Sequence, residues 1–152
     1  MGDFFGSLYC IFEDFFGFEL ANYLWGIASP KSTENSFIGI GLWMLSISFI
    51  VALIYYYVVN HPKLNNWWGW GIFLAINAVI NFLVGWQIVL GNYYDGLMVK
   101  LNSQTNIYEP LNIGESDILC FGVSNMLLSI MVFIIFSFIV KWWSTNCSRA
   151  PF

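Results

Sequence analysis

The sequence predicts an all-α membrane protein with three transmembrane helices and an amphipathic helix at the N-terminus. Hydrophobic residues make up 59% of the 152 residues and charged residues only 9%, whereas a soluble domain carries about 25% charged residues. So few charges could not cover the surface of a water-soluble fold, and a membrane is therefore the expected solvent. Three long stretches free of charged residues supply the expected spans.

The first span is predicted over residues 37–59, which hold no charged residue. A helix rises about 1.5 Å per residue, so this stretch reaches roughly 34 Å, enough to cross a hydrocarbon core of about 30 Å. Pro62 follows the span, and its ring disfavours helical geometry at His61. We therefore expect the helix to end shortly before this pair.

The second and third spans are predicted over residues 67–90 and 119–140. The linker 60–66 is short, so the first two spans should form an antiparallel hairpin. Lys141 closes the third span together with two tryptophans, side chains that suit the depth of the lipid headgroups. The chain then divides into an acidic N-terminal segment (1–36), a transmembrane domain (37–143) that includes an extramembrane loop (92–118), and a short tail (144–152).

An amphipathic helix, with a break near Gly17, is predicted within residues 1–29. One face carries small and polar residues at a spacing of three and four, and the other is largely aromatic; the first set is Asp3, Ser7, Cys10, Asp14, Gly17 and Ala21, and the second is Phe5, Leu8, Phe12, Phe15, Phe16 and Tyr23. Surface helices that bind anionic lipid usually carry Lys or Arg, but none precedes Lys31. We therefore expect this acidic helix to dock onto another copy of the chain or onto another membrane protein, with insertion of its aromatic face into the bilayer as the alternative.

The distribution of charge predicts the orientation in the membrane. All nine acidic residues fall in the N-terminal segment or in the loop 92–118, which three spans place on one side. Lys63, Lys141 and Arg149 lie in short segments on the other side, where the positive-inside rule is most reliable. We predict a multi-pass protein of the inner (cell) membrane, with the N-terminus and the loop outside and the C-terminus in the cytosol.

A stripe of amides along the second span provides the first candidate site. Asn77, Asn81 and Gly85 follow one another at a spacing of four and share one helix face. An amide in lipid needs a partner, so this face should meet another helix or water. The stripe is interpreted as contacts that hold helices together, with the lining of a pore as the alternative.

Small and polar residues mark contact faces on the other two spans. Ser48 and Ala52 form a small-xxx-small pair in the first span, and Asn125 and Ser129 continue this pattern in the third. Small residues let membrane helices approach closely. These faces predict packing within the three-helix unit, and self-association of the chain is the alternative.

The cysteines do not predict a metal site, because they show no Cys-x-x-Cys or Cys/His spacing. Cys10 and Cys120 are expected on the same outer side, where a disulfide between them is a candidate if that side is oxidising. We expect no metal and no cofactor.

The same features set the predicted function. The spans lack ionisable residues, which argues against coupled transport and proton relays, and no catalytic set is recognisable, so we expect no enzyme activity. A net charge of −4 disfavours nucleic acid as a partner. The favoured hypothesis is a structural or anchoring subunit of a membrane complex, with lipid and other subunits or further copies of itself as partners. The alternative is an oligomeric channel or a pore-forming subunit of the holin or defence-effector kind.

Overall fold

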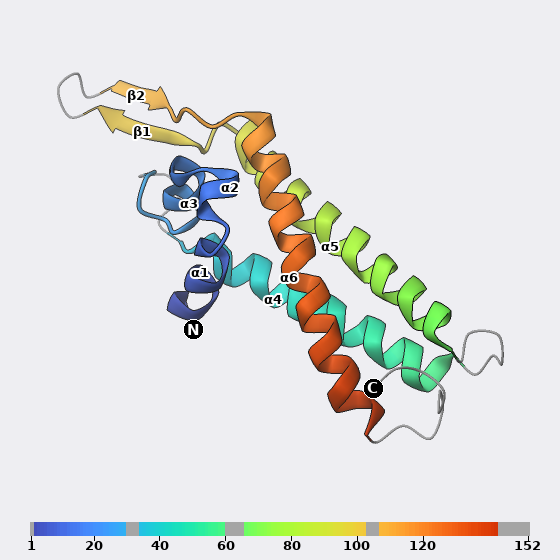
Figure 1. Ribbon diagram of the computed structural model, residues 1–152. Helices are drawn as coiled ribbons and strands as arrows, with labels where there is room; N and C mark the ends of the chain where they lie inside the picture. Colours follow the sequence, from blue (N-terminus) through green and yellow to red (C-terminus); the bar gives the residue numbers. More distant parts are fainter. Residues whose placement is uncertain (1, 30–33, 60–65, 103–106, 143–152) are drawn as a thin grey trace.

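Three long helices dominate the computed structural model, which describes residues 2–29, 34–59, 66–102 and 107–142 (Figure 1). They are α4 (Ser36–Leu53), which continues as a π-helical turn (Ile54–Val58), α5 (Trp67–Tyr94) and α6 (Glu115–Lys141). All three are long and apolar enough to cross a membrane. The prediction of an all-α membrane protein with three spans is confirmed.

Polar side chains begin each long helix by satisfying backbone N–H groups that the helix itself leaves unpaired. The Asn35 side chain accepts a hydrogen bond from the N–H of Phe37, at 3.0 Å. The Asn66 side chain accepts a hydrogen bond from the N–H of Gly69, at 2.9 Å. Before α6, Asp117 Oδ2 accepts from the N–H of Gly114, also at 2.9 Å. The helix starts are therefore fixed by side chains just outside or within the first turn.

The N-terminal segment forms three short helices, α1 (Gly2–Cys10), α2 (Glu13–Phe16) and α3 (Phe18–Leu24). Gly17 adopts a φ of 93°, which favours glycine, and confirms the predicted break. A second break after Cys10 was not predicted. Because these breaks turn the chain, the predicted faces do not hold throughout: Phe15 is exposed and Ala21 is buried.

The loop expected at residues 92–118 is shorter than predicted and contains a β-hairpin. Helix α5 extends to Tyr94 and α6 begins at Glu115. Between them, β1 (Val99–Asn102) pairs antiparallel with β2 (Ile107–Pro110), with Lys100 opposite Glu109. The hairpin was not predicted, because its strands are only four residues long.

The short helices and the hairpin lie at the same end of the bundle, whereas α4 and α6 end, and α5 begins, at the opposite end (Figure 1). Hydrogen bonds between described residues join the N-terminal segment to the loop between α5 and α6. Asn112 N donates to Glu19 Oε2 at 2.8 Å, and Ser29 Oγ donates to the Leu97 carbonyl at 2.9 Å. The chain therefore has the two-sided arrangement that three spans require, although Lys63 and Arg149 lie outside the described residues.

Candidate functional site

The amides predicted on α5 are fully buried, and their Nδ2 groups are hydrogen-bonded within the bundle, whereas Asn81 Oδ1 has no hydrogen-bond partner among the described residues. Asn77 Nδ2 donates to the carbonyl oxygen of Ser129 on α6, at 3.1 Å. Asn81 Nδ2 donates to the carbonyl and side-chain oxygens of Asn77, at 3.0 and 3.1 Å. The Asn77 side chain therefore bonds to the neighbouring helix α6. The Asn81 side chain, one turn further along α5, bonds to Asn77.

Asn125 extends this network from α6. Its Nδ2 donates to the carbonyl oxygen of Asn81 at 2.6 Å. Its Oδ1 accepts a hydrogen bond from the Tyr9 hydroxyl of α1, at 2.5 Å. We call Tyr9, Asn125, Asn81, Asn77 and Ser129 the polar ladder, because their hydrogen bonds run in sequence from α1 through α6 and α5.

Tyr9 was missed by the sequence analysis, although it is fully buried and joins α1 to two spans. Besides donating to Asn125, its hydroxyl contacts Met44 Sδ on α4 at 3.9 Å. Burial raises the pKa of this hydroxyl well above its usual range, so it keeps its proton and acts as a donor. A general signal was available, since a buried tyrosine usually finds a partner for its O–H. The sequence did not indicate which partner.

Glycines allow α5 and α6 to approach closely beside the ladder. A Cβ atom at Gly85 would lie 2.7 Å from Asn125 Nδ2 and 3.0 Å from Asn125 Cβ. A Cβ at Gly122 would lie 3.1 Å from atoms of Phe82 and of Trp86. Gly85 therefore makes room for the amide that carries the ladder from α6 to α1.

Ser48 and Ala52 are buried on α4, as a packing face requires, but they are not part of the ladder. Ala52 belongs to an apolar cluster with Val51 and Phe133 of α6. Ser48 Oγ is buried with no hydrogen-bond partner among the described residues. The predicted site residues thus separate into five on the α5–α6 contact (Asn77, Asn81, Gly85, Asn125 and Ser129) and two on α4.

A second polar contact between α5 and α6 lies toward their other end. Trp70 Nε1 donates to Ser137 Oγ, at 3.2 Å. Trp70 also packs against Phe133 of α6, with ring centroids 6.0 Å apart. Hydrogen bonds therefore join these helices near both the middle and the end of their contact.

The candidate disulfide between Cys10 and Cys120 is not formed, since both are free thiols. Cys10 instead contacts the Trp25 indole, whose Nε1 lies 3.3 Å from its Sγ. The described residues hold no cluster of three His, Cys, Asp or Glu side chains that could bind a metal ion. His61 lies outside the part of the chain that the structure describes.

The chemistry available to the ladder is that of neutral amides, a hydroxyl and backbone carbonyls. Such groups fix the register of helices through directional hydrogen bonds, which are most effective where water is absent. Their donors point at other groups of the ladder and so hold α1, α5 and α6 together. Comparison of the chain with protein-family models, curated proteins and solved structures gives no significant match.

Proposed function

We propose that this chain is a non-enzymatic structural or anchoring subunit of a membrane complex. The polar ladder is the observation that carries this proposal. The amide stripe on α5 had two interpretations, and the donors of Asn77, Asn81 and Asn125 are all engaged within the chain. Amides used in this way support a rigid scaffold rather than a water-lined path.

The N-terminal segment supports the anchoring part of the proposal. One side of this segment packs against the three long helices, and its Tyr9 and Phe16 side chains are fully buried. The other side exposes Ile11 (71%), Phe15 (52%) and Phe18 (67%), and Asp14 is exposed among them. We call Ile11, Asp14, Phe15 and Phe18 the N-terminal exposed face.

A partner protein is the expected occupant of this face. Exposed aromatic residues are typical of protein interaction sites. Asp14 lies beside them, and the segment carries no Lys or Arg before residue 31, so attraction to anionic lipid does not account for the face. The partner would be another membrane subunit or a second copy of the chain, and it would meet the side that the bundle leaves uncovered.

The proposed location is the inner (cell) membrane, with the N-terminal exposed face and the hairpin outside. It rests on the positive residues of the short segments, of which Lys141 closes α6. Labelling with impermeant reagents in intact cells tests it. Reaction at a cysteine placed in the hairpin, as in Ile107→Cys, is expected, and protection there combined with reaction at Cys147 would reverse the orientation.

Native mass spectrometry of the complex in mild detergent tests the function. We expect a fixed stoichiometry with other subunits or a small number of copies, and no ion flux when the chain is reconstituted alone in liposomes. The double variant Phe15→Ser, Phe18→Ser should release the partner. The matched control Leu101→Ser, Ile107→Ser changes exposed apolar residues of the hairpin and should retain it.

Two results would contradict the proposal. A ring of many copies that conducts ions would show a channel or pore instead of a scaffold. A complex that survives in both double variants would show that the N-terminal exposed face does not bind the partner.

A further inference from the structure

An apolar groove opens on the side of the bundle between α1, α4 and α6. Its volume is about 310 Å³, and all ten residues that line it are apolar. We call it the lateral groove and define it by Phe4 and Leu8 of α1, Met44 of α4, and Leu128, Val132 and Phe136 of α6. It is lined by residues of α1, α4 and α6, and none of its lining residues comes from α5.

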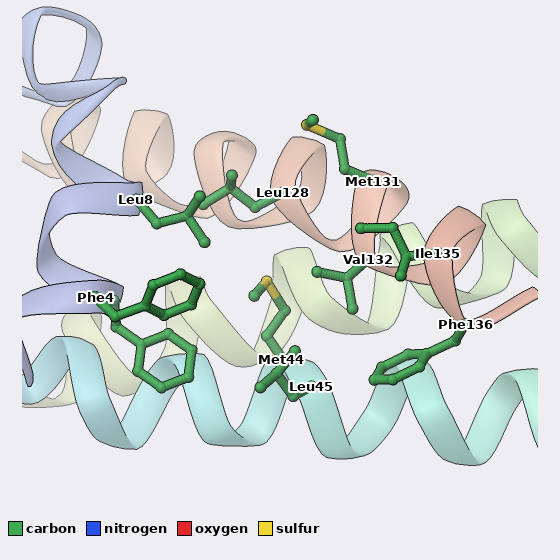
Figure 2. Close-up of a pocket in the computed structure, with 10 residues that line it drawn as sticks. Phe4, Leu8, Met44, Leu45, Leu128, Met131, Val132, Ile135 and Phe136 are labelled. Atoms are coloured by element: carbon green, nitrogen blue, oxygen red, sulfur yellow. The ribbon is translucent and has the colours of Figure 1, made fainter. Parts of the chain in front are cut away.

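The side chains close the groove at both ends and leave its flank open. Figure 2 shows Phe4 and Leu8 at one end and Phe136 at the other, with Met44 and Leu45 of α4 across from Leu128 and Val132 of α6. Met44 and Leu128 are buried and form the floor. Phe4 (66% exposed) and Met131 (60% exposed) form the rim.

The walls that α4 and α6 give the groove lie at the depth of the hydrocarbon core. Met44 is in the interior of the first span, Ser36–Val58, and Leu128 to Phe136 are in the interior of the third, Glu115–Lys141. Its surroundings are therefore lipid tails, and its apolar lining matches them in polarity. Empty space there would forfeit van der Waals contacts on several sides.

We propose that the lateral groove binds one acyl chain of a membrane phospholipid. A flexible chain can follow a floor lined by Met44 and Leu128, and methionine side chains adapt readily to an irregular occupant. The site goes beyond the proposed scaffold function and does not depend on it, because it uses none of the N-terminal exposed face.

The number of lining residues disfavours a protein as the occupant. A stable protein interface needs about 20–30 residues from each partner, whereas ten line this groove. A single acyl chain needs only the short apolar path that these ten side chains enclose.

The test uses purified full-length protein in phosphatidylcholine vesicles whose lipid carries a diazirine midway along one acyl chain. The protein is diluted into lipid-free detergent, irradiated, and mapped by peptide mass spectrometry. The shallow outer face of α5 around Ile72, Ile76 and Val79 is the internal reference, since it is apolar and exposed but has no enclosing walls. We expect about fivefold more retained label in the groove, because walls on three sides multiply the contacts of the chain.

Two variants place a bulky ring in the groove. Val132→Trp fills it from α6, and Met131→Trp fills it from the exposed rim, where folding is least disturbed. Either should lower the groove label to the level of the α5 face and leave the α5 label unchanged. Ile76→Trp on α5 is the matched control and should retain the groove label.

The proposal is overturned if the groove and the α5 face of the wild-type protein carry equal label after dilution and irradiation. It is also overturned if label in the groove survives in the folded Met131→Trp variant. Disulfide formation between two copies that each carry Met131→Cys would assign the groove to a second copy of the chain instead of to lipid.

Discussion

Helix α6 contacts α5 and α4 in two different ways. Toward α5 the contact is direct and partly polar, with glycines that permit close approach and amides that bond across it. Toward α4, in the half of the bundle that carries the short helices, aromatic side chains fill the space between the two helices. The first contact is therefore specified by hydrogen bonds and the second by the volume of the inserted rings.

Helix α1 supplies part of that volume. Tyr9 stacks on Phe37 of α4, with ring centroids 5.2 Å apart, and lies 5.4 Å from the ring of Phe121 of α6. Phe5 packs directly against Gly41 of α4. Tyr9 takes part in both contacts, because its ring fills the α4 side and its hydroxyl completes the polar ladder.

The largest expected effect comes from closing the space between α5 and α6. Gly85→Leu places a side chain against Asn125 and should lower the free energy of unfolding by about 2–3 kcal/mol through overpacking. Unfolding by steric trapping in bicelles measures this change. Gly91→Leu, on the same helix with open space around its Cβ position, is the control and should be neutral. Equal losses in both variants would contradict close packing at Gly85.

A smaller effect is expected from Gly41→Leu, which displaces the Phe5 ring and with it α1. Hydrogen exchange of the α1 amides should accelerate about tenfold or more, which corresponds to a local destabilisation of about 1.4 kcal/mol. Exchange in the middle of α5 should not change. Gly39→Leu lies two residues away in open space and should leave α1 protected. Faster exchange in α5 as well would show that the two contacts are not separable.

The link between the two contacts is tested by a double-mutant cycle of Tyr9→Phe and Asn125→Leu. Tyr9→Phe keeps the ring and removes only the hydroxyl that bonds Asn125. We expect a coupling energy of about 0.6 kcal/mol and at most about 1.7 kcal/mol, the average and the maximum of double-mutant cycles between membrane helices. The cycle is measured by unfolding in bicelles. Additive effects would mean that Tyr9 acts only through its ring.

The smallest effect is expected at Ser48, whose buried hydroxyl has no hydrogen-bond partner among the described residues. Ser48→Ala removes an unsatisfied polar atom and should be neutral or stabilising by up to about 1 kcal/mol. Asn77→Ala breaks the bond to Ser129 and should be destabilising in the same assay. A clear loss of stability in Ser48→Ala would reveal a partner for that hydroxyl.

The sequence alone determined the three spans and their order, because length and absence of charge are local properties that a bilayer requires of any spanning helix. It also placed Asn77 and Asn81 on a contact face, since spacing sets which side chains share one side of a helix. The break at Gly17 was predicted for a similarly local reason.

The contacts that these buried side chains make depend on the tertiary structure. The hydrogen bond from the Tyr9 hydroxyl to Asn125 joins two residues that are far apart in the sequence. No periodicity in the sequence predicts such a pairing. The same holds for Cys10 and Cys120, which are free thiols in the structure. It holds also for the lateral groove, whose walls come from three separate helices. Local pattern fixes which face of a helix is buried, but only packing in three dimensions fixes what that face meets.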